Sequence, residues 1–251
     1  MNAFLTTSLL FGCLIGVVWV GRSVRRHLPE HHLSADSKDA VKLAMGLVAT
    51  MTALLLGLLI SSAKGGYDAQ RSEVIQMAAK IAFLDRLLVL YGPEAVDARA
   101  QFHDAVAETV RRMWPEENGR PVQLRPASEG GNEVYFAIQR LSPRDDAQRN
   151  LKAQASTLAT ELGQLRALLL AQSEPSISKP LLIAVVSWLM ILFLSFSLFA
   201  PPNATTALAM FAAAFSVAGA LFLILELDQP MSGTIRISSN PMHNALNHDA
   251  K

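Results

Sequence analysis

The sequence predicts an all-α membrane protein with four transmembrane helices and an amphipathic helical domain inserted between the second and third of them. The chain of 251 residues is 51% hydrophobic and only 17% charged, which is more apolar than soluble domains usually are. Four stretches are almost free of charge, whereas fifteen basic and fifteen acidic residues gather between residues 64 and 179. The formal net charge of +1 provides no basic excess for nucleic-acid binding, so that class of function is set aside.

Residues 3–20 form the first predicted transmembrane helix. They carry no charge, and at a rise of about 1.5 Å per residue they are long enough to cross a hydrocarbon core of roughly 30 Å. A cleaved signal peptide would have basic residues before its apolar run, whereas here Arg22, Arg25 and Arg26 follow it. A retained membrane anchor is therefore expected. The only cysteine, Cys13, lies within this run, which excludes an intrachain disulfide.

Three further apolar stretches complete the predicted spans. Residues 41–63 contain one charge, Lys42, close enough to the end for its side chain to reach the headgroups. Residues 180–200 and 203–227 are uncharged as far as Glu226 and are separated only by a proline-rich turn. The predicted domains are residues 1–63 with the first two spans and a basic loop, 64–179 exposed to water, 180–227 with the last two spans, and 228–251 as a turn and polar tail.

Residues 64–179 are predicted to fold into amphipathic helices. The first helix carries apolar residues at alternating steps of three and four, which place them on one face. They are Val74, Met77, Ile81, Leu84, Leu88 and Tyr91. Gly92 suits a helix end and Pro93 the first turn of the next helix, which should end near Trp114.

The second half of this domain has a mixed pattern. Residues 115–133 contain prolines and glycines without periodicity and are expected to form a loop. Residues 134–141 fit either a short strand or a helix. Ser142 and Pro143 predict the start of a long helix. Its apolar residues repeat with heptad spacing, which indicates packing either within one chain or between subunits. They are Leu151, Ala155, Leu158, Leu162, Leu165 and Leu169.

Three stretches carry a resemblance to a known family. They are LLLGLLISSAKGGYDAQRSEV at 54–74, LDRLLVLYGPEA at 84–95 and LDQPMSGTIRIS at 227–238. The last is similar to a Leu-Asp-x-Pro-Phe-Ser-Gly-x-x-Arg-Ile-Ser pattern, with Met231 in place of the usual phenylalanine. Over nearly its whole length the chain resembles the bestrophin-like domain proteins, which are bacterial four-span membrane proteins.

This resemblance implies a function as well as a fold. The family is named for a likeness to bestrophins, which are pentameric anion channels with four spans and a large helical domain between spans two and three. The resemblance implies an oligomeric pore for small inorganic ions rather than an enzyme. The alternative function is a non-conducting scaffold or sensor whose helical domain binds a partner through the heptad stripe of residues 151–169.

The second span carries small residues on one face, at steps of three and four. They are Gly46, Thr50, Ala53, Gly57 and Ser61. Small side chains let helices approach closely in lipid, so a packing face is one interpretation. The other is the lining of a pore, with Lys64 one turn further on attracting anions at its mouth.

Charged residues are predicted to gather where the second and fourth spans end, on the same side of the membrane. They are Lys64, Glu226, Asp228 and Arg236. An unpaired charge in a low dielectric is costly, so an ion pair between one of these acids and one of these cations is expected. A turn at Pro230 and Gly233 would send the chain back toward the membrane. An ion or proton site is the alternative.

No metal, cofactor or catalytic site is predicted. His27, His31 and His32 lie in a short basic loop without matched carboxylates or cysteines, which favours a solvated loop over a metal site. The sequence contains no nucleophile elbow, phosphate-binding glycine loop or paired-carboxylate motif. The expected partners are the lipid bilayer, further copies of the chain and small inorganic ions.

The charge of the first loop predicts the orientation in a bacterial inner membrane. Short loops rich in Lys and Arg stay in the cytoplasm, and residues 21–40 contain three arginines and Lys38. Residues 64–179 would then be extracytoplasmic. The bestrophin resemblance implies a cytoplasmic domain instead, and the charge rule is preferred here.

Overall fold

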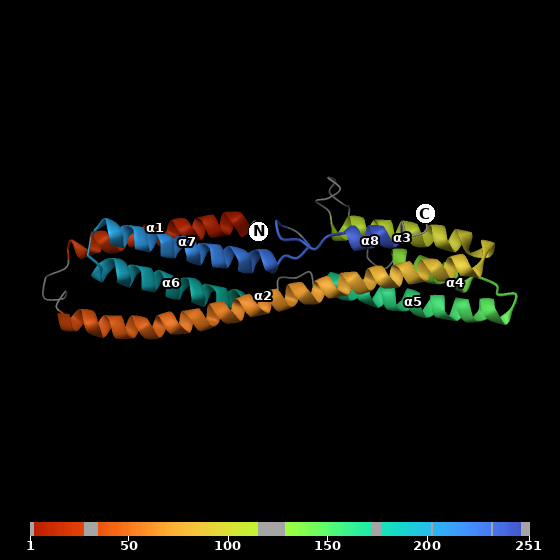
Figure 1. Ribbon diagram of the computed structural model, residues 1–251, viewed down its shortest axis with the longest axis horizontal. Coiled ribbons are helices and arrows are strands. Elements are labelled where there is room, and N and C mark those ends of the chain that lie inside the picture. The colour runs from red at the N-terminus through yellow and green to blue at the C-terminus, as the bar shows by residue number, and fades with distance from the viewer. Residues whose placement is uncertain are drawn as a thin grey trace. The chain divides into compact units, whose positions relative to one another are not determined.

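The computed structural model describes residues 3–27, 35–114, 129–171, 177–201, 203–231 and 233–246. Over these residues it contains helices and no strand, which confirms the predicted all-α class (Figure 1). The helices are α1 (Ala3–Arg25), α2 (Ala35–Tyr91), α3 (Val96–Met113), α4 (Glu129–Gln139), α5 (Asp146–Ala171), α6 (Lys179–Phe199), α7 (Ala204–Leu227) and α8 (Asn240–Leu246). The chain divides into two compact units, which are Met1–Tyr67 with Pro175–Gln229 and Asp68–Glu174 with Pro230–Lys251.

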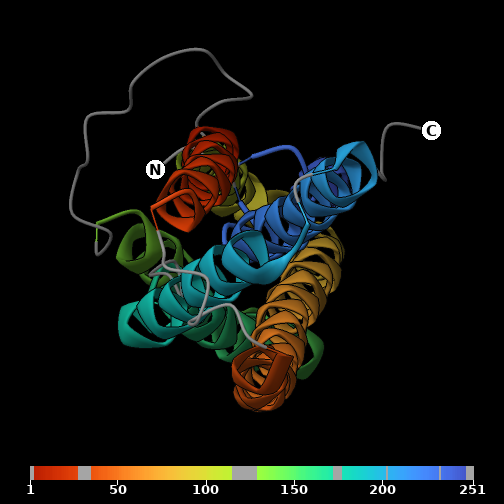
Figure 2. The ribbon, with the colours of Figure 1, turned by 90° about the vertical axis from the view of Figure 1, so that its left-hand side faces the viewer.

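The first unit holds the four predicted spans. α1, the first part of α2, α6 and α7 each contain one apolar stretch, and each is long and apolar enough to cross a membrane. Figure 2 looks along these helices from one end. A helix suits the bilayer because it bonds its backbone N–H and C=O groups internally. Over the described residues, the prediction of four helices long and apolar enough to span a membrane is confirmed.

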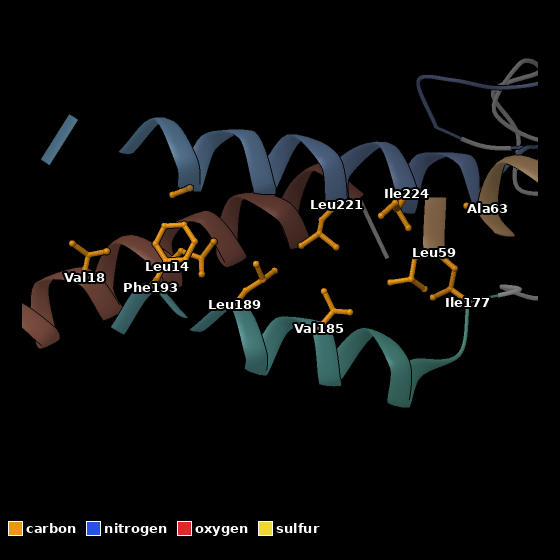
Figure 3. Packing of buried hydrophobic residues seen from close by; sticks show 11 residues of the cluster. Leu14, Val18, Leu59, Ala63, Ile177, Val185, Leu189, Phe193, Leu221 and Ile224 are labelled. Atoms are coloured by element: carbon orange, nitrogen blue, oxygen red, sulfur yellow. The ribbon is translucent and has the colours of Figure 1, made fainter. Parts of the chain in front are cut away.

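One buried cluster holds the four spans together (Figure 3). α1 packs against both α6 and α7. The cluster consists of Leu14, Val18, Leu59, Ala63, Ile177, Val185, Leu189, Phe193, Ala214, Leu221 and Ile224. α1 and α6 approach closely at Gly21, where a Cβ would lie 1.8 Å from Ser197 Oγ.

The outward surface of this unit is largely apolar. Phe4, Trp19, Leu43, Leu54 and Phe215 are each more than half exposed. Soluble monomers rarely expose apolar patches of this extent. These side chains are suited to contact with lipid, and the protein is therefore a membrane protein.

The second unit is built around the rest of α2. All six residues of the stripe predicted between Val74 and Tyr91 are buried. The helix ends as predicted, because Gly92 adopts a φ of 112° that favours glycine and Pro93 opens the next turn. α3 then ends at Met113 with Trp114 as its C-cap, also as predicted. Within this unit α3 packs against α4 and α8, and α4 packs against α5.

Residues 134–141 are not a strand. Most of them belong to α4, which buries Val134, Ala137 and Ile138 at helical spacing. This face lies against α3 and α5, so tertiary packing decides between the two structures that the short apolar run allowed. The strand alternative is therefore wrong. α4 also takes up the end of the predicted loop, and residues 115–128 lie outside the described part of the chain.

α5 begins later than Ser142 and Pro143 predict. Asp145 Oδ1 accepts a hydrogen bond of 2.7 Å from the backbone N–H of Gln148, and this bond caps the new start. The Gln148 side chain donates in turn to the Tyr91 carbonyl at 3.0 Å. The first turn of α5 is therefore attached to the end of α2, and this contact favours the start at Asp146 over the predicted start at Ser142 and Pro143.

The heptad stripe of α5 packs within the chain. Ala155, Leu158 and Leu169 are buried, and Leu151, Leu162 and Leu165 are half-buried. α5 packs against α4, and Glu161 of α5 forms an ion pair with Lys80 of α2. Of the two alternatives for this stripe, the structure thus contains the intrachain one.

Candidate functional site at the membrane boundary

Two of the charged residues predicted at the membrane boundary, Lys64 and Glu226, come just after members of the buried cluster in the sequence. Figure 3 places Ala63 and Ile224 at the same end of that cluster, so α2 and α7 leave it together. Lys64 comes next on α2 and is exposed, whereas Glu226 near the end of α7 is only 5% exposed. The inward position of Glu226 agrees with the helical spacing, and its pairing with a cation stays a prediction.

Asp228 has a partner that the sequence did not suggest. Its Oδ1 accepts a hydrogen bond of 3.2 Å from the backbone N–H of Ile177, just before α6 begins. Asp228 is also the C-cap of α7. The carboxylate therefore links the end of α7 to the start of α6. Every residue except proline has a backbone N–H, so the sequence does not reveal which one is the donor. The sequence therefore pointed only to charged side chains as partners of Asp228.

The predicted turn after α7 is the start of a closed loop in the second unit. The carbonyl of Pro230 accepts a hydrogen bond of 2.8 Å from the N–H of Ile237, which joins the two ends of the loop. Gly233 lies between them with a φ of 92°, a conformation that residues with a Cβ rarely adopt. Arg236 is exposed on this loop, so its predicted return toward the acids stays a prediction.

Trp114 anchors this loop to the helical domain. Its indole Nε1 donates a hydrogen bond of 2.7 Å to the carbonyl of Ile237, and both residues are almost completely buried. Met242 of α8, five residues after Ile237, is fully buried. α8 packs against α3, the helix that ends at Trp114. The sequence marked Trp114 only as a helix end. A tryptophan at the border of a polar, proline-rich stretch was the available signal, because such a ring is rarely placed there without something to cover it.

A second polar cluster lies where α2 and α3 meet in the second unit. The side chain of Asp85 is 4% exposed and receives two hydrogen bonds of 2.7 Å from Arg99, one to each carboxylate oxygen. His103 Nε2 lies 2.7 Å from Asp85 Oδ1. This cluster is not among the sites that the sequence predicted. Its signal was an acid beside Leu84 in the buried stripe, followed by two basic residues one helical turn apart.

The charge of Asp85 is stabilised in the folded protein. Burial alone would raise the pKa of its carboxyl, but the hydrogen bonds and positive charges of Arg99 and His103 outweigh burial and lower the pKa below its ordinary value. Such a group stabilises the fold at pH values above its unfolded pKa of about 3.9. That contribution is lost as the pH falls through the lower pKa of the folded state.

The small-residue stripe of α2 lies outside the buried cluster. Gly46, Thr50, Ala53, Gly57 and Ser61 are all exposed in the single chain. A Cβ added to Gly46 or Gly57 would meet nothing within 4 Å. The face of α2 that is buried here carries Thr52, Leu59 and Ala63 instead.

Replacing Asp85 should lower stability and change its pH dependence. Asp85→Asn removes the charged acceptor of Arg99, which we expect to cost about 1.5–3 kcal/mol at neutral pH. The variant should also lose less stability than the parent on acidification, because it lacks the depressed carboxyl. Thermal unfolding in detergent from about pH 7 to about pH 3 measures both effects. Asp104→Asn, at an exposed position of α3, is the matched control. Parallel curves for parent and Asp85→Asn would contradict this assignment.

Removing the indole donor should loosen the closed loop. Trp114→Phe keeps an aromatic ring but leaves the buried carbonyl of Ile237 without this donor, at an expected cost of about 1–3 kcal/mol. Thermal unfolding measures the loss, and limited proteolysis should show faster cleavage within residues 230–246. Trp19→Phe, at a position that is 74% exposed, is the control and should behave like the parent. An unchanged melting temperature for Trp114→Phe would argue against the anchor.

The comparison with protein families agrees with these features. The profile described as Bestrophin-like domain matches residues 12–242. No match is found among curated proteins or among solved structures. The matched range begins within α1 and includes the other three spans, Asp85 with its partners, Trp114 and the closed loop after α7. The chain therefore belongs to the bestrophin-like family.

Proposed function

We propose that this membrane protein is an oligomeric, bestrophin-like pore for small inorganic ions and not an enzyme. The observation that carries the proposal is the exposure of the small-residue stripe on α2. Every one of its five members, from Gly46 to Ser61, is uncovered in the single chain. Membership of the bestrophin-like family supports the proposal by analogy.

The stripe is suited to contact with another helix. In lipid, helices associate through close packing and not through a hydrophobic force, which is why interfaces favour small residues. At about 100° per residue, the stripe lies roughly 150° around α2 from the buried Thr52 and Leu59. Two different faces of this span are thus available, one for the chain's own helices and one for a neighbouring subunit.

Lys64 supports a pore for anions. It follows Ser61 by one helical turn and is exposed on the same side of α2 as the stripe. In an assembly around the stripe, one lysine from each subunit would form a ring of positive charge at the end of the span. Rings of Lys or Arg favour anions in pores.

The alternative of a scaffold is less well supported. It depended on the heptad stripe of α5 as a surface for a partner. All six of those residues are at least half-buried within the second unit, so the stripe is largely used inside the chain. The scaffold alternative also gives no role to the small residues that are exposed on the α2 span.

We also propose that residues 64–179 are extracytoplasmic in a bacterial inner membrane. The support is the short basic loop that contains Arg22, Arg25 and Arg26, together with the positive-inside rule.

Cysteines on the stripe should crosslink between subunits. In a Cys13→Ser background, which removes the only native thiol, we expect Ala53→Cys and Gly57→Cys to form disulfide-linked dimers on mild oxidation. Leu58→Cys is the control, because residue 58 is exposed on another face. In planar bilayers, a thiol reagent should reduce the current of Gly57→Cys and not that of Leu58→Cys. Absence of current from a verified oligomer over varied salts and voltages would instead favour the scaffold.

Thiol labelling tests the orientation. In the same background, Asn150→Cys in the second unit and Ser23→Cys at the end of α1 both present exposed thiols. A maleimide that cannot cross the membrane should label Asn150→Cys on intact spheroplasts and Ser23→Cys only after lysis. The opposite pattern would place the helical domain in the cytoplasm.

A further inference from the structure

A cavity of about 530 Å³ lies in the first unit where α1 and α6 end and α7 begins. Its volume is within the range of ligand-binding pockets. Three arginines from the end of α1 line one side, and residues at the end of α6 and the start of α7 line the rest. The lining residues are Arg22, Arg25, Arg26, Ser197, Ala200, Asn203, Ala204 and Ala207.

The electrostatic character of this cavity is positive. None of the described residues that line it is acidic. Asp39 of α2 does not line it and forms an ion pair of 2.9 Å with Lys42 on its own helix. Asn203 and Ala204, the N-cap and the first residue of α7, line the cavity, so the N-terminus of this helix adds partial positive charge. One of its first N–H groups, that of Thr206, is already bonded to Asn203 Oδ1 at 2.8 Å. An anion would therefore be attracted from two sides, by guanidinium groups and by a helix end.

The arginines are held in different ways. Arg25 donates a hydrogen bond to the carbonyl of Ala200 at the end of α6, so its side chain bridges two walls of the cavity. Arg22 is half-buried and Arg26 is exposed. Guanidinium groups bind phosphate oxygens through paired hydrogen bonds, which makes phosphate a fitting ligand for such an arrangement.

The position of the cavity identifies the source of that phosphate. The apolar run of α1 ends at Val20, just before the first arginine, so the arginines lie at headgroup depth. Trp19 lies three residues before Arg22 on α1, and Phe196 precedes the lining residue Ser197 on α6. Both rings are exposed, and aromatic rings are common at the membrane interface. A ligand here would have its charge among arginines and its body beside apolar side chains, which describes a lipid better than a free ion.

We propose that this cavity binds the phosphate headgroup of an anionic lipid. The inference depends on the membrane location and is independent of ion conduction. Basic pockets between membrane helices recognise anionic headgroups by this chemistry.

The test measures lipid binding to the full-length protein. Purified protein in a neutral detergent is titrated with phosphatidylglycerol, cardiolipin, phosphatidylcholine or inorganic phosphate, and the shift in melting temperature reports binding. We expect larger shifts with the two anionic lipids than with the other two additions. Arg22→Gln/Arg26→Gln, which leaves the Arg25 bridge in place, should weaken the apparent affinity for anionic lipid about tenfold or more.

A matched variant separates this site from general charge attraction. Arg86→Gln/Arg140→Gln removes two exposed arginines from the second unit and should bind anionic lipid like the parent. Ala207→Glu keeps all three arginines and places a carboxylate at the cavity wall, so it should also weaken binding and serves if the double variant does not fold. Equal losses in both double variants, equal shifts with phosphatidylcholine, or the same shift with inorganic phosphate at equal concentration would overturn the proposal.

Discussion

The unbroken course of α2 is the constraint on which both units depend. One helix, Ala35–Tyr91, supplies a membrane span to the first unit and a helix with a buried apolar stripe to the second. Residues 35–91 contain no proline, and the pair Gly65-Gly66 does not interrupt the helix although each glycine lowers helix stability by about 1 kcal/mol. Because helical backbone groups bond to one another, the same backbone suits both lipid and water. Only the side chains change, from an uncharged span to an apolar stripe on a charged helix.

The stretch LDQPMSGTIRIS acts as a connector in which each half is secured by its own unit. Asp228 bonds to the backbone of Ile177 within the first unit, and the loop from Pro230 to Ile237 is closed within the second. Trp114 then bonds to Ile237. Two of these hydrogen bonds, from Ile177 to Asp228 and from Trp114 to Ile237, connect the stretch to residues far away in the chain. A pattern of this kind specifies the fold before it specifies a chemistry.

The sequence predicted those features that depend on local composition. Length and absence of charge located the four spans, and a spacing of three and four predicted the buried face from Val74 to Tyr91. It could not decide whether residues 134–141 were strand or helix, because a short apolar run suits both until its neighbours are known. The roles of Asp85 and Trp114 depend on partners 14 and 123 residues away, which leave no periodic trace in one sequence. The sequence predicted Ser142 as the N-cap of α5, whereas the structure uses Asp145. Both residue types are good N-caps, and the contact of Gln148 with Tyr91 favours the later start.

Several hydroxyl groups in the membrane spans form hydrogen bonds within their own helices. Thr50 Oγ1 donates to the carbonyl of Leu47, and Thr52 Oγ1 donates to that of Val48, so each hydroxyl is bonded within its own helix. Ser187 and Ser216 do the same on α6 and α7. Hydroxyl groups bonded in this way need neither water nor a partner helix. The polar atoms of these residues are therefore no evidence that the stripe of α2 lines a water-filled pore. Size is what distinguishes the stripe, because small side chains on an uncovered face let a second helix approach closely. The small side chains of α2 therefore directly favour association of subunits along this helix. Conduction requires in addition that the exposed Lys64 side chains of the associated subunits face a shared opening.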